Sequence, residues 1–589
     1  MAARDHVMVK PKDSRGALRR LLAYLGAFKL PILLVAVLCV TSNILALWGP
    51  NLAGSAINAA AAGPGKVDFS LVSYYAGRML MVYVSSSLIS IMIHVIMVNV
   101  SRRVARKMRQ DIFDKLMRLP VGFFDRNLAG DIISRASYDV DVISTCMATD
   151  VVSILTSVVT VTGALIMMVS ISPALSLAAL VTVPASIAYT THMRKLTQPR
   201  FAKRSRSYGA MNGFVEEMLS GQKTILAYAH EDRVDARYAE INGAAAQAYY
   251  DADSLGMTIG PTMGFINNIC LSLIALLGSI LYMNGAIGLG SISSFVLYSR
   301  KFSGPINEVA NVINELFSAL AAADRVFSLM DQTEEKHDVP DAEALENVKG
   351  DVRLEHVSFG YDPGRTIIHD LSMRADAGKL IAIVGPTGAG KTTIINLLMR
   401  FYDVDQGAVL VDEKDIRGLT RRSLRSSYAM VLQDTWVFRG TIRENIAYGR
   451  ENATMEEVVA AAKAARIHPF IMRLPQGYET VISEDGGNIS KGQKQLLTIA
   501  RAMLYDARML ILDEATSNVD TSTERHIQKG MRDLMTGRTC FVIAHRLSTI
   551  RSADLILVLD HGDVKEQGTH ESLMAAKGFY YRLYRSQFE

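Results

Sequence analysis

Long stretches without any charged residue dominate the first half of the chain. Residues 30–65, 151–191 and 254–299 contain no Asp, Glu, Lys, Arg or His, and residues 79–101 contain only His94. An α-helix needs about 20 apolar residues to cross a hydrocarbon layer of roughly 30 Å, so each stretch is long enough for at least one crossing. Because lipid offers the backbone no hydrogen-bond partners, segments that span it must be helical.

The two later uncharged stretches, residues 151–191 and 254–299, are each long enough for two crossings joined by a tight turn. Turn-forming residues lie within them at 171–173 and at 284–288. The first apolar run starts too late and is too long to be a cleaved signal peptide, so we expect it to be retained. The pattern therefore predicts six membrane helices, near residues 28–50, 76–101, 141–170, 174–194, 254–283 and 288–318.

Basic residues gather on one side of these predicted helices. They cluster before the first helix, after the second and after the fourth, whereas the opposite loops carry almost no charge. The positive-inside rule then places the N-terminus and two long loops, about residues 102–150 and 194–253, in the cytoplasm. An even number of crossings returns the chain to the cytoplasm for its second half. We expect a multi-pass protein of the cytoplasmic (inner) membrane.

The two long cytoplasmic loops are typical of helices that continue well beyond the bilayer. Near their middles lie two less regular pieces, residues 120–125 and 212–217, where Pro and Gly predict turns at the tips. For the second piece, a loop that merely folds back is an equally good interpretation. Our candidates for tips that dock on another domain are Gly122, Phe123, Phe124, Phe214 and Glu216.

Composition excludes several classes of protein. The 63 Lys and Arg against 58 Asp and Glu give a net charge of +5, which is too small an imbalance to indicate a nucleic-acid partner. The 4 cysteines are far apart and form no CxxC pair, so neither a zinc site nor a disulfide framework is indicated. A chain of 589 residues that is 49% hydrophobic is too long for one core and too apolar for a disordered protein.

An acidic, Pro-containing stretch at residues 331–346 separates the two halves of the chain. Beyond it, short apolar runs alternate with helical segments, which is typical of a wound α/β sheet. Because residues 385–392 match G-x-x-x-x-G-K-[ST], we predict a multi-domain protein, with an all-α six-helix transmembrane domain followed by an α/β P-loop ATPase domain. The expected divisions are an N-terminal cytoplasmic segment, the membrane domain, a linker and the ATPase, at residues 1–27, 28–330, 331–350 and 351–589.

A phosphate-binding motif follows the apolar run at residues 379–384. Its pattern, G-x-x-x-x-G-K-[ST], lies between a predicted strand and a predicted helix, as a P-loop requires. Backbone N–H groups and the helix N-terminus face phosphates, the lysine reaches the β and γ oxygens, and the hydroxyl ligates Mg²⁺. The ATP-binding residues predicted here are Gly385, Pro386, Thr387, Gly388, Ala389, Gly390, Lys391, Thr392 and Thr393, with Thr392 also a Mg²⁺ ligand.

A second apolar run, residues 509–512, ends in Asp513 and Glu514. Two carboxylates at the end of a buried strand are costly unless they have partners, and a magnesium nucleotide provides them. We expect Asp513 to hold the metal, as the second acidic element of P-loop ATPases does. Glu514 is the candidate that polarises the attacking water, with a surface acid as the lesser alternative.

These motifs and their order resemble the ATP-binding cassette (ABC) transporter family over nearly the whole chain, as one half-transporter of the exporter type. The resemblance implies that Gln433 meets Mg²⁺ and the membrane domain's tips, and that Tyr361 stacks on adenine. It also implies that His545 contacts the γ-phosphate, although a lone histidine after a strand is more often structural. Residues 517–520 resemble the loop that connects the two ATP sites.

The family's signature motif departs from its usual Leu-Ser-Gly-Gly-Gln form. Here it is Ile489, Ser490, Lys491, Gly492 and Gln493. In the family, the signature clamps the γ-phosphate held by the partner's P-loop, so we count Ser490, Gly492 and Gln493 among the nucleotide-binding residues. Lys491 adds bulk where a backbone approaches phosphate, or it supplies a compensating charge.

The complete P-loop and altered signature resemble one partner of the heterodimeric bacterial multidrug exporters. We predict ATP-driven export of amphipathic small molecules or lipids by alternating access, with ATP and Mg²⁺ bound between two cassettes. The expected partners are a second half-transporter, more plausibly a different chain than a copy, the lipid bilayer and a hydrophobic or amphipathic cargo, but no nucleic acid. A homodimeric lipid flippase is the alternative, and an ATP-gated channel or regulator is a weaker one.

Few residues in the sequence indicate which molecule is transported. Ionisable residues within predicted crossings are functional candidates by default, and these are His94, Asp150 and Arg78. An interfacial or interhelical contact is the favoured interpretation of each. A drug, a lipid or a peptide all fit this pattern.

Overall fold

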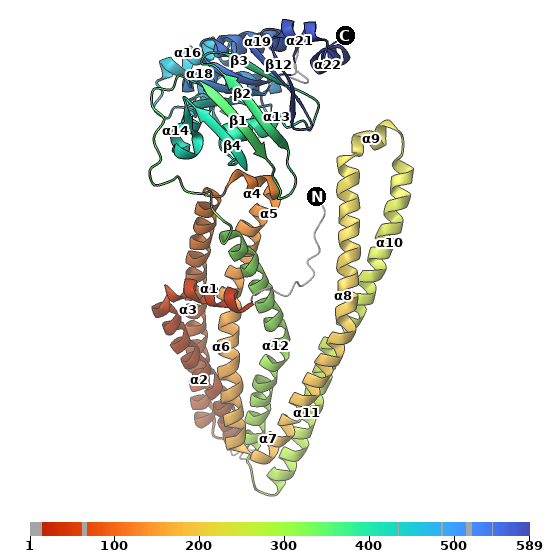
Figure 1. Ribbon diagram of the computed structural model, residues 1–589. Coiled ribbons are helices and arrows are strands. Elements are labelled where there is room, and N and C mark those ends of the chain that lie inside the picture. Colours follow the sequence, from red (N-terminus) through yellow and green to blue (C-terminus); the bar gives the residue numbers. More distant parts are fainter. Residues whose placement is uncertain are drawn as a thin grey trace. The chain divides into compact units, whose positions relative to one another are not determined.

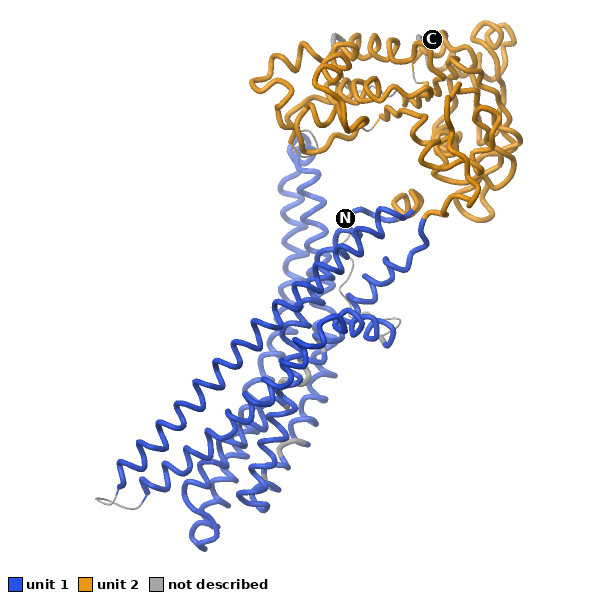
Figure 2. Tube along the Cα trace, turned by 90° about the vertical axis from the view of Figure 1, so that its left-hand side faces the viewer, with its two compact units in different colours: residues 1–119, 127–334 blue, residues 120–126, 335–589 orange. Residues whose placement is uncertain are grey.

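The computed structural model describes residues 14–61, 67–433, 435–483, 487–513, 521–544 and 546–588. The chain divides into two compact units (Figure 2). The first contains residues 1–119 and 127–334, and the second contains residues 120–126 and 335–589. The tip of the first predicted cytoplasmic loop therefore groups with the C-terminal unit.

In its described part, the first unit consists of helices (Figure 1). A π-helical turn, Arg135–Asp139, joins α5 to α6. The helices α2, α3, α6 and α12 pack against one another, and α8 packs along α10. The helices of this unit are α1 (Ser14–Gly26), α2 (Lys29–Ala60), α3 (Phe69–Leu116), α5 (Ala129–Ser134), α6 (Val140–Ile171), α7 (Pro173–Leu180), α8 (Thr182–Ser220), α9 (Gln222–Ala227), α10 (Glu231–Gly256), α11 (Ile259–Met283) and α12 (Leu289–Met330).

Four helical segments of the described chain are long and apolar enough to cross a membrane: Lys29–Ala60, Phe69–Leu116, Ala129–Ile171 and Glu231–Met283. They contain four of the six predicted crossings. The predicted crossing at 174–194 lies in α7 and α8, and the one at 288–318 lies in α12. Helices are therefore present at all six predicted positions, while the count of six membrane crossings stays a prediction.

Both predicted turns between paired crossings are confirmed. Ser172 accepts a hydrogen bond from the backbone N–H of Leu175 at 3.4 Å, and Pro173 occupies the first turn of α7. Proline suits that position because its missing N–H would have no partner inside the helix. At the other turn, Gly285 takes a left-handed φ of +72° between α11 and α12, which glycine adopts without steric cost.

The predicted turn at residues 212–217 is wrong. Helix α8 continues through this piece to Ser220, and the chain reverses later, through α9 and His230. One glycine in a helix costs only about 1 kcal/mol relative to alanine. Packing of α8 along α10 offsets that cost, and Arg204 of α8 forms an ion pair with Asp253 of α10. Phe214 and Glu216 therefore lie on a continuous helix rather than in a loop.

The first tip is confirmed as a short separate element. Helix α3 ends at Leu116, and α4 (Val121–Arg126) begins after Pro120. On the other side of this tip, the π-helical turn that leads into α6 is linked to α12 by Arg325, which donates to both carboxylate oxygens of Asp139 at 2.9 and 2.6 Å. Asp139 is only 3% exposed, whereas the Arg325 side chain is 44% exposed, so the pair lies at the edge of the helix packing.

The second unit is built on a six-stranded sheet with the order β12-β11-β3-β10-β9-β6 and a four-stranded sheet with the order β2-β1-β4-β5. The first is parallel apart from its edge strand β12, and the second is antiparallel. The strands are β1 (Val352–Phe359), β2 (Ile368–Ala375), β3 (Leu380–Val384), β4 (Gln406–Val411), β5 (Lys414–Asp415), β6 (Tyr428–Val431), β7 (Gly440–Thr441), β8 (Val481–Ile482), β9 (Met509–Asp513), β10 (Thr539–Ile543), β11 (Leu555–Asp560) and β12 (Asp563–Gly568).

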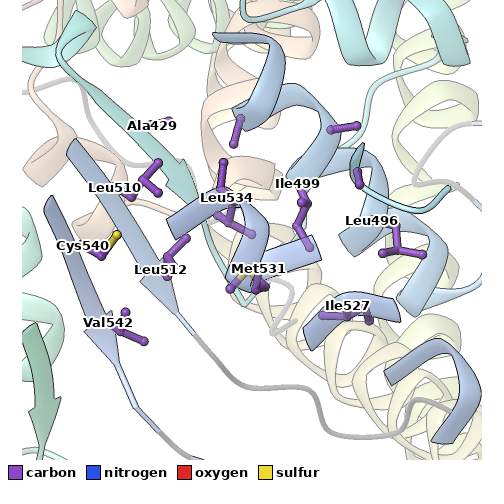
Figure 3. Packing of buried hydrophobic residues seen from close by; sticks show 14 of the residues in the cluster. Ala429, Leu496, Ile499, Leu510, Leu512, Ile527, Met531, Leu534, Cys540 and Val542 are labelled. Carbon is purple, nitrogen blue, oxygen red and sulfur yellow. The ribbon is translucent and has the colours of Figure 1, made fainter. Parts of the chain in front are cut away.

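Helices cover this sheet on both faces, as the wound α/β pattern predicts. On one face, Leu510, Leu512 and Val542 pack with Ile499 and Met531 (Figure 3). Ile511 and Phe541 point to the other face, because successive side chains of a strand alternate. The helices are α13 (Lys391–Leu398), α14 (Arg421–Ser426), α15 (Ile442–Ala447), α16 (Met455–Ala464), α17 (His468–Ile471), α18 (Lys491–Tyr505), α19 (Thr521–Met535), α20 (Leu547–Arg551), α21 (His570–Ala576) and α22 (Phe579–Phe588).

Candidate functional site

The order of the parallel strands brings the P-loop and Asp513 to one edge of the sheet. Strand β10 lies between β3 and β9, and its Ile543 pairs with Ile383 on one side and with Asp513 on the other. The carboxyl ends of these strands therefore meet, although residues 384 and 513 are far apart in the chain. This is where open α/β sheets bind ligands.

The loop between β3 and α13 has the backbone shape that its glycines allow. Gly388 and Gly390 take left-handed φ values of +83° and +100°. A Cβ atom on Gly390 would lie 2.7 Å from the Ile368 side chain, so a larger residue is excluded by space as well as by conformation. Helix α13 starts at the next residue, Lys391, and its free N–H groups open towards this edge.

A cavity of about 540 Å³ lies at this edge. Eight predicted residues line it: Thr387, Gly388, Gly390, Lys391, Thr392, Thr393, Gln433 and Asp513. Three lining residues were not predicted: Arg365, Ile367 and Ile543. Gly385, Pro386 and Ala389 do not line it and instead shape the loop.

Lys391 is held by the loop that precedes it. Its ammonium group donates to the carbonyl oxygens of Gly385 at 2.8 Å and of Pro386 at 2.9 Å. Burial lowers the pKa of Lys391, and the carboxylate of Asp513 opposes that shift. The cation is therefore positioned at the cavity beside an acid, and an incoming polyphosphate would replace the carbonyl contacts with stronger charge-assisted ones.

The residues predicted to bind Mg²⁺ come together around this cavity. Thr392 supplies a hydroxyl, Gln433 an amide oxygen and Asp513 a carboxylate, and all three line the same space. Oxygen donors of this kind suit Mg²⁺, which prefers a few protein oxygens together with substrate phosphates. The donor set therefore fits a magnesium nucleotide.

Tyr361 lies beside the P-loop helix but does not line the cavity. Its hydroxyl donates to the Thr393 hydroxyl at 3.3 Å and accepts from the Asn396 amide at 3.0 Å. The ring packs edge-on against Tyr402, with centroids 4.9 Å apart. Stacking of Tyr361 on adenine stays a prediction, and these contacts hold the ring next to the predicted phosphate site.

The signature residues form the start of α18. Ser490 caps the helix, with its hydroxyl accepting from the Gln493 N–H at 3.3 Å and its own N–H donating to the Gln493 side chain at 2.8 Å. Lys491 is the first residue of the helix and is exposed, and Gly492 is buried. Ser490, Gly492 and Gln493 do not line the cavity of their own chain.

The two predicted catalytic residues, Glu514 and His545, lie outside the described residues, as do residues 517–520. Their neighbours are placed, because Asp513 ends β9 and Ala544 follows β10. The roles assigned to Glu514 and His545 stay predictions.

The α4 segment contacts the ATPase fold next to Tyr361. Asp125 accepts a hydrogen bond from the Tyr402 hydroxyl at 2.6 Å. Arg126 donates to the backbone carbonyl of Tyr361 at 2.6 Å and to the Asp362 carboxylate at 3.2 Å. Burial and then Asp125 raise the pKa of Tyr402. The sequence reasoning did not include Asp125 and Arg126 among the tip candidates, because a charged residue near a loop tip is usually solvated.

Gly122 lies against Tyr402, and Phe123 next to it is buried. A Cβ atom on Gly122 would lie 2.9 Å from the Tyr402 hydroxyl, so this position requires a very small residue. Phe123 is buried, and its ring packs edge-on against Phe124 at 5.4 Å. The predicted tip residues therefore include one buried anchor, Phe123.

Comparisons with known proteins match both halves. The family model described as the ABC transporter transmembrane region matches residues 32–306, and the model described as ABC transporter matches residues 368–517. An uncharacterized ABC transporter ATP-binding protein of Bacillus subtilis is 43% identical over 580 residues, which are 98% of this chain and 96% of the relative.

Two further relatives carry more specific descriptions. A fatty acid ABC transporter ATP-binding/permease protein of Mycobacterium tuberculosis is 43% identical, covering 89% of this chain and 83% of the relative. An ATP-dependent lipid A-core flippase of Syntrophus aciditrophicus is 33% identical, covering 84% and 82%. The solved structure of a bacterial Atm1-family ABC exporter with ATP bound matches with a TM-score of 0.77 at 31% identity, covering 95% of this chain and 99% of that chain.

Proposed function

Because this chain belongs to the ABC transporter family, we propose that it exports amphipathic molecules of the lipid, fatty-acid or drug type across the cytoplasmic membrane. The chain is a multi-pass membrane protein whose ATP hydrolysis is coupled to transport. The observation that carries the proposal is the cavity lined by Lys391, Thr392, Gln433 and Asp513, in a polypeptide that also contains helices of bilayer length. The N-terminus and the ATPase lie in the cytoplasm in this proposal, following the basic residues.

In this proposal, the P-loop amides and Lys391 bind the β- and γ-phosphates. Mg²⁺, when bound, neutralises phosphate charge and orients the γ-phosphate, and Thr392, Gln433 and Asp513 would hold it. Glu514 follows Asp513 in the chain and orients the attacking water. His545, which follows Ala544 in the chain, contacts the γ-phosphate in this proposal.

Two cassettes enclose two nucleotides in this proposal, each between one chain's P-loop and the other chain's signature. ATP binding drives the change of access only through contacts that differ between the open and closed states. The phosphate clamp by the signature is such a contact, because it forms only when the cassettes close. The α4 contact with Tyr402 and Tyr361 then transmits cassette movement to the helices that α4 connects.

We further propose that the partner is a different half-transporter. Lys491 occupies the first helical position of the signature, where its side chain is exposed and where the family carries glycine. A chain with this signature completes its partner's site poorly, whereas its own P-loop site can receive an intact signature from another chain. A homodimer is the alternative, and the relative described as a lipid flippase is the reason to test lipid cargo in both arrangements.

A reconstituted transport assay tests the proposed function. The purified full chain, with and without a co-purifying second half-transporter, is placed in vesicles and supplied with MgATP. A fluorescent fatty acid, a labelled phospholipid and a cationic dye serve as cargo probes. We expect MgATP-dependent movement of at least one probe that Glu514→Gln abolishes while MgATP binding persists. Absence of magnesium-dependent ATP binding to the wild-type chain would refute the proposal.

A further inference from the structure

The loop between β1 and β2, residues 360–367, contributes a wall of the nucleotide cavity. Arg365 and Ile367 of this loop line the cavity together with Thr387, Gly388 and Lys391. Neither residue belongs to a motif that the sequence analysis identified. The cavity thus contains a second cationic residue, supplied by a segment other than the P-loop.

The loop is held firmly in place. The Ile367 N–H donates to the Phe359 carbonyl at 2.8 Å, and the Arg365 N–H donates to the Asp362 carbonyl at 3.2 Å. A Cβ atom on Gly360 would lie 2.2 Å from the Arg365 carbonyl oxygen, so the two ends of the loop approach closely. The backbone of Arg365 is therefore positioned before any ligand binds.

A contact from outside the loop supports the same geometry. Arg126 of α4 donates to the Tyr361 carbonyl and to the Asp362 carboxylate, and so holds the first half of the loop. The Tyr361 hydroxyl in turn donates a hydrogen bond to the Thr393 hydroxyl of the P-loop helix. The loop is thus connected both to α4 and to the helix that begins at Lys391.

The charge of Arg365 has no counterpart within the described part of the chain. Its side chain is exposed, and no described carboxylate forms an ion pair with its guanidinium, whereas Arg374 and Arg417 pair with Asp376 and Asp415. Among the described residues that line the cavity, Asp513 is the one acid beside the two cations Lys391 and Arg365. Two cations at one cavity favour an anionic ligand, and an arginine can donate two parallel hydrogen bonds to a phosphate.

We propose that Arg365 is a nucleotide-binding residue that contacts the polyphosphate near its adenosine end. This inference rests on the proposed function, in which the cavity binds MgATP. Lys391, fixed beside the Gly385 and Pro386 carbonyls, serves the β- and γ-phosphates. Arg365 instead lies on the same short loop as Tyr361, which is predicted to stack on adenine and whose hydroxyl contacts Thr393. We therefore assign Arg365 to the α-phosphate, which ATP and ADP share.

The test measures equilibrium binding of MgATP and MgADP to the full chain in lipid nanodiscs. We expect Arg365→Ala to weaken both nucleotides by the same factor, about tenfold, because one charge-assisted contact is lost from each. Arg365→Lys restores part of the affinity, since it keeps the charge but not the two parallel hydrogen bonds. The matched control is Arg532→Ala, which removes an exposed arginine of α19 that has no ion pair among the described residues.

The outcomes separate the inference from the proposed function. If the wild-type chain binds no MgATP, the proposed function fails. If the wild-type chain binds MgATP and Arg365→Ala binds both nucleotides with wild-type affinity, only the role of Arg365 at the α-phosphate is refuted. A loss of affinity for ATP alone refutes that role as well. The nucleotide-free melting temperature of each variant is compared with that of Arg532→Ala, and Arg365→Lys provides the same test should the alanine variant not fold.

Discussion

At the scale of single residues, the site depends on where cations stand relative to a few oxygen atoms. Lys391 is bonded to two carbonyls of its own loop, close to Asp513. Exchanging these carbonyls for a nucleotide costs little free energy, because phosphate oxygens are better hydrogen-bond acceptors for the ammonium group than neutral carbonyls. The side chain is therefore positioned for its ligand.

Lys391→Ala removes this cation together with its hydrogen bonds to the Gly385 and Pro386 carbonyls. We expect MgATP affinity to fall by about 10- to 100-fold, since a contact between charged groups is lost. Titration of the purified chain with MgATP measures the change. Lys463→Ala, in the last turn of α16, is the control, because that lysine is exposed and does not line the cavity. Equal affinity in both variants would contradict the assignment of Lys391.

At the scale of elements, the N-terminus of α18 carries one stabilising feature, its side-chain cap, and one destabilising feature, the charge of Lys491. The side chain of Ser490 accepts from the backbone N–H of Gln493, and the side chain of Gln493 accepts from the backbone N–H of Ser490. This reciprocal cap stabilises the helix N-terminus. Lys491 places a positive charge at the positive end of the helix dipole, which is unfavourable in the isolated chain. The same charge would face phosphate in a closed dimer, so its net effect depends on the partner.

Lys491→Gly distinguishes the two interpretations of the signature. We expect the ATPase rate of the chain purified alone to rise, because glycine lets the α18 backbone approach the partner's phosphate. The measurement is phosphate release at saturating MgATP, with Lys494→Gly in the same helix turn as the control. A lower rate in Lys491→Gly would show that the lysine charge contributes to the site.

Helix α4 is the second element whose role is testable. Phe123 is its buried anchor, beside the Asp125 contact with Tyr402. We expect Phe123→Ala to retain ATP hydrolysis but to reduce transport per ATP severalfold, because the loss of a buried aromatic loosens the contact. Both rates are measured on the same vesicles. Phe69→Ala is the control, since Phe69 is 76% exposed at the start of α3. If the two variants transport the same amount of cargo per ATP, α4 does not transmit the movement.

At the scale of the whole molecule, the question is what completes the ATP site. The signature residues of this chain do not line its own cavity, and in the proposed function a second cassette completes the site. The proposed partner is a different chain with an intact signature. Hydrolysis is then a property of the pair, whereas nucleotide binding is a property of this chain.

We therefore expect the chain purified alone to bind MgATP but to hydrolyse it slowly. Addition of the partner half-transporter should raise hydrolysis, and Glu514→Gln should then lower it by at least about 100-fold, as expected for a general base. Affinity purification followed by mass analysis identifies a co-purifying chain. Rapid hydrolysis by this chain alone, abolished by Glu514→Gln, would exclude an obligatory partner and favour the homodimer.

Local patterns in the sequence predicted much of this architecture. Uncharged runs predicted the positions of long helices, because hydrocarbon excludes charge and unpaired backbone groups regardless of the neighbouring segments. The P-loop was also predictable, since glycine conformation, the helix N-terminus and Lys391 all lie within a few residues. The turn at 212–217 was not, because packing of α8 along α10 outweighs one glycine.

The order of the long helices, the strands and the motifs could be inferred from the sequence, since these follow from hydropathy and spacing within short segments. The contacts between distant segments became clear from the three-dimensional arrangement alone. The pairing of Ile543 with both Ile383 and Asp513 brings the acid to the P-loop, and the β1–β2 loop brings Arg365 to the same cavity. These contacts depend on strand order and register, which arise from packing across the whole domain. They cannot be inferred from the spacing of residues along the chain.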